Sequence, residues 1–182
     1  LSYFAIFNIA HAAYQQTFTI SAYYSPIEGQ ERYVTGSLAG DIRLNGSGVN
    51  SADGTPVYPG MIAAPKSYAF GTKMNIPGIG LVAVHDRGGA IVHAGERGQS
   101  YDRLDVWMGY GDAGLNRALN WGKRNVEVTV YGIDPSIKEN VYLAGFTEAE
   151  KFIKTIVAEQ KIFKTDIGYG QTDDKIGELQ RY

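Results

Sequence analysis

The 182-residue chain contains no cysteine, which excludes disulfide bridges, thiolate metal sites and cysteine nucleophiles. It has no large excess of charge, because 17 lysines and arginines stand against 19 aspartates and glutamates. The net charge of −2 therefore gives no electrostatic basis for binding nucleic acid, and the lack of a basic run argues against a membrane surface. The sequence shows no internal repeat, no low-complexity tract and no integral membrane segment.

The remaining composition is that of a globular domain. Hydrophobic residues make up 44% of the chain and charged residues 20%. The length is sufficient for one domain with its own core. The 13 tyrosines and 23 glycines favour a protein rich in strands and loops, able to contact sugars or other flat polar ligands.

Residues 1–16 are apolar at first and include Ala10-His11-Ala12, a small-x-small pattern typical of the end of a signal peptide. A signal-peptide remnant predicts an exported protein of the cell envelope, the periplasm or the extracellular space. A first core strand or helix, or a simple N-terminal extension, fits these residues equally well. The apolar run is too short to span a membrane.

Five short segments have the β-branched, aromatic or alternating composition of strands: 17–24, 73–76, 81–85, 104–108 and 125–131. Residues 112–122 predict a short helix, with Asp112 as its N-cap and a glycine at its end. Residues 36–60 are dense in Gly, Asn, Ser and Asp and predict a long ordered loop. Short strands, glycine-rich turns and one helix predict a small β-barrel.

The texture of the sequence changes after Asp134-Pro135, which predicts a boundary near residue 134. Residues 147–150 (TEAE) form a capping box, and apolar residues follow it at helical spacing. Residues 135–182 are therefore predicted to be a helical extension.

Asp86 stands where the predicted strand ends and the chain enters Arg87-Gly88-Gly89. This position puts a carboxylate at the rim of a barrel, and the two glycines remove Cβ atoms that would keep a ligand from the backbone. The alternative is that Asp86 accepts hydrogen bonds from the amides of the following turn, as aspartates commonly do.

Asp105 shares a strand face with Arg103 and Trp107, since side chains alternate along a strand. An aromatic neighbour raises the pKa of a carboxyl by desolvation, whereas a cation lowers it. Proton donation near neutral pH requires desolvation to dominate, as in the general acid of glycosidases. The alternative is a surface ion pair between Arg103 and Asp105, which contributes little. Asp102 is predicted to be a solvated turn residue.

The chain contains, in this order, TISAYYSP, GMIAAP, FGTKMNIPGIG, VHDRGGAI, DRLDVWMGYG and, after the predicted helix, WGKRNVEVTVYG. This series, from about Thr17 to Gly132, resembles the bacterial three-aspartate (3D) domain of sporulation and stationary-phase cell-wall proteins and of lytic transglycosylases. The order of the motifs is more specific than any one of them. The resemblance implies a mainly β fold, with a six-stranded double-psi β-barrel over residues 17–134, a short helix and long loops.

The resemblance also implies a function. The protein would be a lytic transglycosylase that cleaves the β-1,4 bond between N-acetylmuramic acid and N-acetylglucosamine in peptidoglycan glycan strands and forms a 1,6-anhydro product. By motif, Asp86 and Asp105 face each other across a glycan groove. Asp105 falls at the catalytic acid and base of the family, and Asp86 would support the sugar ring. No metal or cofactor is implied.

Other residues are candidates for substrate binding around these two aspartates. Thr72 and Lys73 would supply hydrogen bonds, Gly88 and Gly89 would allow close approach to the backbone, and Arg103 lies beside Asp105. The candidate sugar-stacking aromatics are Tyr23, Tyr24 and Trp107. Strand alternation places one of the two tyrosines in the barrel core.

Two features depart from the family pattern. Ala64 stands where the family has its remaining aspartate, and the spacer between the two other aspartates is longer, by roughly HAGERGQSY. At the C-terminus, GYGQTDDKIGELQRY is similar to the opening of a peptidoglycan-binding type 1 domain. An ordinary polar C-terminal helix explains that segment equally well.

Three other functions compete with this interpretation. The barrel could bind glycan without cleaving it, which the alanine at position 64 would allow. An aspartic peptidase needs two aspartates that share a proton, and the single D-x-G-G motif would then require a homodimer. A zinc hydrolase would use His85, Asp86 and His93, but adjacent residues of a strand point to opposite faces.

Overall fold

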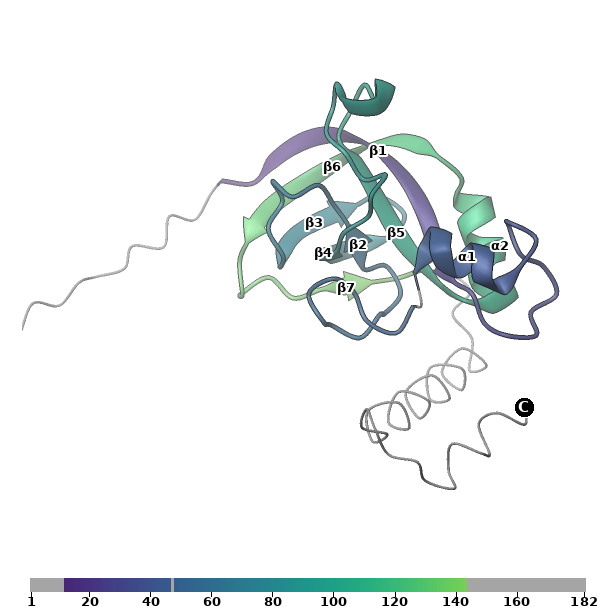
Figure 1. The fold of residues 1–182 in the computed structure, drawn as a ribbon. Coiled ribbons are helices and arrows are strands. Elements are labelled where there is room, and N and C mark those ends of the chain that lie inside the picture. The colour runs from purple at the N-terminus through teal and green to yellow at the C-terminus, as the bar shows by residue number, and fades with distance from the viewer. Residues whose placement is uncertain (1–11, 47, 144–182) are drawn as a thin grey trace, which may run out of the picture. The chain divides into compact units, whose positions relative to one another are not determined.

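The computed structural model describes residues 12–46 and 48–143 (Figure 1). Their strands are β1 (Tyr14–Ser25), β2 (Ile62–Ala63), β3 (Thr72–Ile76), β4 (Gly80–Asp86), β5 (Arg103–Tyr110), β6 (Arg124–Ile133) and β7 (Asn140–Val141). Two helices, α1 (Leu38–Asn45) and α2 (Gly111–Trp121), and a short 3₁₀ turn, η1 (Glu96–Gly98), accompany them. The signal-peptide interpretation and the helix predicted from residue 147 fall largely or wholly outside the described residues.

Six of these strands form a closed barrel, which confirms the prediction of a mainly β barrel fold. The strand order is β2-β5-β1-β6-β3-β4, and a further pairing of β2 with β4 closes the ring. β1 runs parallel to β5 and β2 runs parallel to β4, while the other neighbours in the ring are antiparallel. β7 lies past residue 134 and pairs with the beginning of β4. The five strands predicted from the sequence are β1, β3, β4, β5 and β6.

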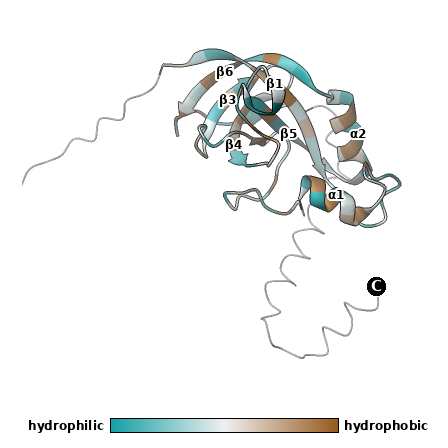
Figure 2. Ribbon diagram, turned by 45° about the horizontal axis from the view of Figure 1, so that its top comes forward, coloured by the Kyte–Doolittle hydropathy of each residue, from teal (hydrophilic) through white to brown (hydrophobic). Residues whose placement is uncertain are grey.

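Alternation along the strands fills the barrel. Hydrophobic and hydrophilic residues alternate along β1 and its neighbours (Figure 2). The side chains that point inward form a continuous buried cluster, which includes Phe18, Ile20, Met74, Val84, Leu104 and Val128. Each fully buried side chain of this size contributes about 1.5–3 kcal/mol through the hydrophobic effect. The opposite faces of the same strands remain available for polar contacts.

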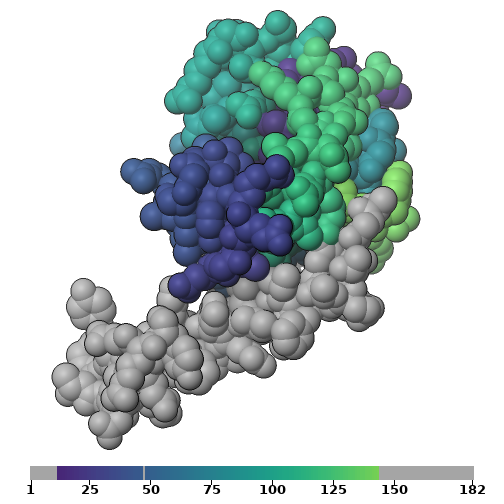
Figure 3. All heavy atoms as spheres, turned by 90° about the vertical axis from the view of Figure 1, so that its right-hand side faces the viewer, coloured from purple at the N-terminus to yellow at the C-terminus, as the bar shows by residue number. Residues whose placement is uncertain are grey.

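The helix predicted at residues 112–122 is confirmed as α2, which ends at Gly122 with a φ of 66°. The expected N-cap is wrong, because Tyr110 occupies that position and Asp112 lies in the first turn. The Asp112 carboxylate instead accepts hydrogen bonds from the backbone N–H groups of Glu31 and Arg32. These bonds fasten the segment before α1 to α2, and Figure 3 shows the two (dark blue and green) side by side.

The interval 36–60, predicted to be a loop, contains the helix α1. Ser37 is its N-cap, with the hydroxyl oxygen accepting from the N–H of Gly40. Asp41 is the buried residue of this helix, and its carboxylate accepts from both backbone and side chain of Thr35, from the N–H of Val34 and from the hydroxyl of Tyr24. α1 is therefore held by a carboxylate rather than by an apolar face.

Among the described residues, no helix is both long and apolar enough to cross a membrane.

We expect Gly114→Ala to destabilise the barrel. A Cβ atom at position 114 would lie 2.4 Å from the carbonyl carbon and oxygen of Gly109, at the end of β5. The overlap should lower the free energy of unfolding by about 1–3 kcal/mol, although alanine is the better helix former by about 1 kcal/mol. Urea unfolding followed by tryptophan fluorescence measures the change. The control is Asn120→Ala on the exposed part of α2, which should be neutral or slightly stabilising. Equal stability of the Gly114 variant and the wild type would contradict the close contact.

Candidate functional site

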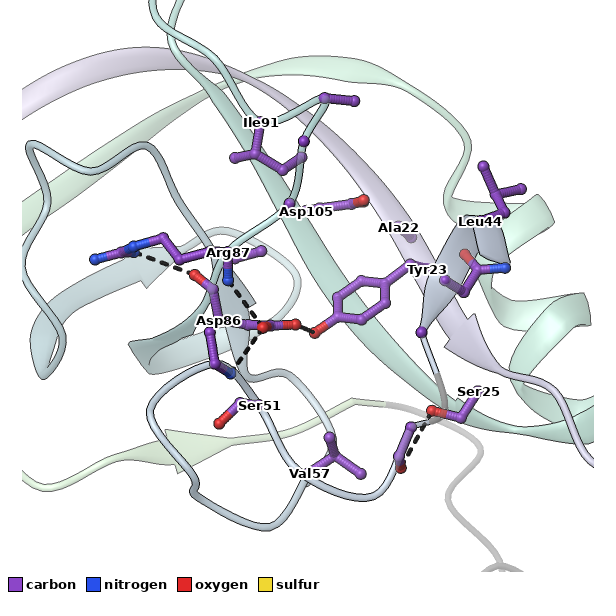
Figure 4. Close-up of a pocket in the computed structure, with 18 of the residues that line it drawn as sticks. Ala22, Tyr23, Ser25, Leu44, Ser51, Val57, Asp86, Arg87, Ile91 and Asp105 are labelled. Carbon is purple, nitrogen blue, oxygen red and sulfur yellow. Dashed lines mark hydrogen bonds between the residues drawn. The ribbon is translucent and has the colours of Figure 1, made fainter. Parts of the chain in front are cut away.

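A cavity of about 600 Å³ opens on one side of the barrel (Figure 4). The second half of β1, β2 and β5 form part of its wall. The rest comes from the end of α1 with the chain that follows it, up to Val57, and from residues 86–91 at and after the end of β4. Asp86 and Asp105 both line it, so the structure brings together the two carboxylates that the sequence singled out.

The pairing of β2 explains how the two aspartates come to share this cavity. Ala63 of β2 is opposite Asp86 on the parallel strand β4 and opposite Asp105 on the antiparallel strand β5. Two strand spacings of about 4.8 Å separate the backbones of the two aspartates by about 10 Å. Ala63 lines the cavity between them with a single methyl group. β2 therefore puts no side chain larger than a methyl group between the two aspartates.

Asp86 is held in place by three hydrogen bonds. Its Oδ1 accepts from the N–H groups of Ala52 (3.0 Å) and Arg87 (2.8 Å), and its Oδ2 accepts from the Tyr23 hydroxyl at 2.7 Å. The hydrogen bond from the Arg87 N–H is of the kind that the alternative interpretation of Asp86 predicted, from the turn that follows it. The bonds to Ala52 and Tyr23 come from other parts of the cavity wall. Asp86 thus joins β1, β4 and the segment after α1.

Asp105 is half-buried, and burial raises the pKa of its carboxyl to about 6. A hydrogen bond from Ser21 and the charge of Arg103 oppose this rise in pKa, and the nearby negative charge of Asp86 adds to it. The Oδ1 atom of Asp105 is buried and has no hydrogen-bond partner within the described part of the chain. A carboxyl with this pKa exchanges its proton near neutral pH, and the residue lines the cavity.

Arg103 lies near Asp105 and is hydrogen-bonded to Ser21. Its Nε and Nη2 atoms donate to the Ser21 hydroxyl oxygen at 3.2 and 2.9 Å, and Ser21 lies opposite Asp105 on the neighbouring strand. Ser21 in turn hydrogen-bonds the Asp105 carboxyl. The direct Arg103–Asp105 ion pair that was the alternative interpretation is not formed in the described residues. Arg103 is thereby held at the cavity wall.

Tyr23 presents its ring to the cavity, between β1 and Asp86 (Figure 4). Burial raises the pKa of its hydroxyl well above the ordinary value, and the charge and hydrogen bond of Asp86 add to the effect. Tyr24, which points the other way along β1, is buried and bonded to Asp41. The expectation that the two tyrosines divide between the cavity and the interior is met.

Gly88 and Gly89 line the cavity, as expected of the loop after β4. A Cβ atom at position 88 would lie 2.8 Å from Cγ1 of Ile91, whereas position 89 faces open space. The absence of a side chain at Gly88 therefore lets Ile91 pack beneath the loop. At Gly89 the absence of a side chain leaves the backbone accessible from the cavity.

Three other candidates do not line the cavity. Trp107 is 1% exposed, its indole N–H donates to the Ser25 hydroxyl at 2.8 Å, and its ring packs edge-on against Tyr110. The expectation that it offers a face to a sugar is wrong, because the indole is buried, with Ser25 and Tyr110 against it. Thr72 is buried and donates to the carbonyl of Ala69, and Lys73 pairs with Glu139 at 2.9 Å.

Asp102, predicted to be a solvated turn residue, is instead mostly buried. Its carboxylate accepts from the Tyr68 hydroxyl (2.6 Å), the Gln16 amide (3.2 Å) and the N–H of Ala94 (2.8 Å). Burial alone would raise its pKa, but these hydrogen bonds lower the pKa below the ordinary value. Asp102 therefore ties the loop between β4 and β5 to the barrel.

The residues of the zinc alternative point in different directions. His85 contacts Asp53, with 2.6 Å between Nδ1 and Oδ2, on the side of β4 opposite to Asp86. His93 lies 3.4 Å from Asp102. Within residues 12–46 and 48–143, no three histidine or acidic side chains are arranged to hold a metal ion.

Comparison of the chain with protein-family models and with curated proteins gave no match.

We expect the two aspartates to affect stability with opposite signs. The raised pKa of Asp105 means that its ionised form opposes folding, so Asp105→Asn should stabilise the protein by about 1–3 kcal/mol at pH 8 and have little effect near pH 4. The lowered pKa of Asp102 means that its ionised form favours folding, so Asp102→Asn should destabilise at pH 8 and less so as the pH falls below 4. Urea unfolding at both pH values measures the differences. A loss of stability in Asp105→Asn at pH 8 would contradict the assigned shift.

Proposed function

We propose that this protein is a peptidoglycan lytic transglycosylase of the 3D type, exported to the cell envelope, in which Asp105 is the catalytic acid and base. One observation carries the proposal: the cavity is lined by a half-buried carboxyl with a pKa of about 6 and by a second carboxylate whose two oxygens are both hydrogen-bonded. Two carboxyls in unlike environments are typical of glycosidic bond cleavage. The order of the sequence motifs supplies the substrate class.

In this mechanism the protonated Asp105 donates its proton to the glycosidic oxygen as the bond from C1 of N-acetylmuramic acid to that oxygen breaks. The resulting carboxylate then takes the proton from the C6 hydroxyl of the same sugar while the C6 oxygen bonds to C1. One residue serves both steps because the proton leaves and returns at one place. The products are a 1,6-anhydromuramoyl end and a free N-acetylglucosamine hydroxyl.

Asp86 has an electrostatic and positioning role in this mechanism. Its oxygens are occupied by Ala52, Arg87 and Tyr23, so it is held rigidly toward the gap above Ala63. A fixed negative charge there favours the positive charge that develops on the sugar ring as the bond breaks. Tyr23 offers a ring at the same wall, against which a sugar can lie.

The substitution of alanine for the family's remaining aspartate weighs less than the sequence alone suggested. Ala64 is 1% exposed and belongs to the hydrophobic core of the barrel. It does not line the cavity, so a carboxylate is not missing from the wall near Asp86 and Asp105. This observation favours an enzyme over the alternative, a barrel that binds glycan without cleaving it.

We expect Asp105→Asn to reduce the release of anhydromuropeptides from purified sacculi by at least about 100-fold, because the amide cannot donate the proton. Mass spectrometry of the soluble products measures the release and identifies the 1,6-anhydro end. Asp134→Asn, on the loop after β6 and outside the cavity, is the matched control and should release products at the wild-type rate. Wild-type protein that is retained on sacculi without soluble products would support the binding module instead. Undiminished release by Asp105→Asn would remove this residue from the mechanism.

We expect Ala63→Leu to block the site without removing either aspartate. The methyl group of Ala63 lies between Asp86 and Asp105, so a larger side chain there occupies the gap that the linkage needs. Product release should fall at least about tenfold, since small displacements at a reacting centre have large effects on rate. Ala69→Leu, at an exposed position, is the control, and thermal melting shows whether each variant is folded. A folded Ala63→Leu protein with full activity would place the substrate elsewhere.

A further inference from the structure

Residues 50–57 form a tight turn that makes part of the cavity wall. An isolated bridge joins Asn50 to Pro56, and the N–H of Ser51 donates to the carbonyl of Thr55 at 2.9 Å. Of these residues, Val57 and Ser51 are buried, and both line the cavity (Figure 4). The turn has little apolar surface to hold it in place, so polar contacts with β4 must position it.

Three contacts fasten the 50–57 turn to the end of β4. The N–H of Asp53 donates to the carbonyl of His85 at 3.1 Å, and the N–H of Ala52 donates to the carboxylate of Asp86 at 3.0 Å. The third contact joins Nδ1 of His85 to Oδ2 of Asp53 at 2.6 Å, with both side chains less than one-fifth exposed. His85 and Asp86 are adjacent at the end of β4 and both bind the turn, while Asp86 also lines the cavity.

Other charged groups surround His85. Its Nε2 lies 3.7 Å from Oε1 of Glu139, which precedes β7. Glu139 is also paired with Lys73 of β3 and accepts a hydrogen bond from the hydroxyl of Tyr58, whose ring packs edge-on against the imidazole. The Thr55 hydroxyl lies 3.3 Å from Nδ1. The imidazole is therefore placed between two carboxylates, and Lys73 offsets the charge of one of them.

We propose that His85 is a positioning residue: through its contact with Asp53 it holds the 50–57 turn against the cavity and so directs the N–H of Ala52 onto Asp86. This inference rests on the proposed function only in so far as Asp86 serves a substrate. The contact itself, and its effect on the turn, do not depend on which substrate binds. Asp53 is the partner that transmits the effect, since its other carboxylate oxygen accepts from Ser51 and Thr55 within the turn.

The contact should weaken as the pH rises. The nearby Glu139 carboxylate and the hydrogen bond to Asp53 raise the pKa of His85 above its ordinary value of 6.5, and burial opposes this rise. A raised histidine pKa means that the protonated form favours the closed turn, fully below pH 6.5 and progressively less as the pH passes the raised value. Above that value the neutral ring loses its attraction to both carboxylates, although one N–H bond to Asp53 remains available.

Amide hydrogen exchange at Ala52, followed by NMR at pH 6, tests the proposal in the whole chain without any substrate. His85→Gln should lower the protection of the Ala52 N–H about tenfold or more, because a charge-assisted hydrogen bond is lost. Asp53→Asn should lower it similarly, and the double variant should add little to either, since both remove one contact. His93→Gln, a histidine change outside the turn, is the matched control and should leave the protection unchanged. Unaltered protection in a folded His85→Gln or Asp53→Asn protein would overturn the proposal.

A pH titration of the Ala52 amide shift gives a second, spectroscopic signature. In an Asp105→Asn background, which removes the neighbouring group that titrates near pH 6, the Ala52 shift should follow the midpoint of the His85 ring. That step should disappear in His85→Gln and persist in His93→Gln, and a step that persists in His85→Gln would contradict the proposed coupling. Release of anhydromuropeptides by His85→Gln should fall about tenfold if the proposed function is correct. If the wild type releases none, the proposed function fails while the amide measurements still decide on His85.

Discussion

The two-residue strand β2 determines the geometry on which the site depends. It pairs with β4 on one side and β5 on the other, and these pairings close the barrel. Because Ala63 stands opposite both Asp86 and Asp105, closing the barrel also fixes the distance and direction between the two carboxyls. The core on the inner side of the same strands, with Ile62, Val84 and Val106 fully buried, holds this arrangement against the repulsion of two like charges. The fold and the site therefore depend on the same contacts.

Aspartates in this domain mainly serve as anchors for segments that lack apolar side chains. Asp41, Asp53, Asp86, Asp102 and Asp112 each accept at least one backbone N–H from a loop or helix end. Such bonds to a charged acceptor contribute about 1.5–3 kcal/mol each, enough to order chain that has little surface to bury. Asp105 differs, because its bonds from Ser21 and Val106 leave Oδ1 buried and without a partner in the described residues. A buried oxygen without a partner is costly, which distinguishes Asp105 from the five aspartates that anchor loops and helix ends.

The sequence predicted the long, alternating elements well and the polar anchors poorly. Strands such as 125–131 were recognisable because alternation records which face is buried, and α2 was recognisable from its glycine end. α1 was missed because Asp41, rather than an apolar stripe, holds it, and β2 was missed because two residues show no period. The two cavity carboxylates were found from their positions at and within strands. Their partners Ser21 and Ala52 carried no local signal, since they meet the aspartates only across the barrel.

Trp107 and Asp102 illustrate how a correct local inference can lead to a wrong environment. Alternation placed Trp107 on the face of Asp105, but the indole is buried there, bonded to Ser25 and packed against Tyr110. Asp102 stands one residue before β5, where a turn carboxylate is usually solvated, yet Tyr68 and Gln16 reach it from two other segments. Periodicity states which side of a strand a residue takes, but it does not state what covers that side. In this barrel the half-buried Asp105 lines the cavity, while Trp107, two residues further on, does not.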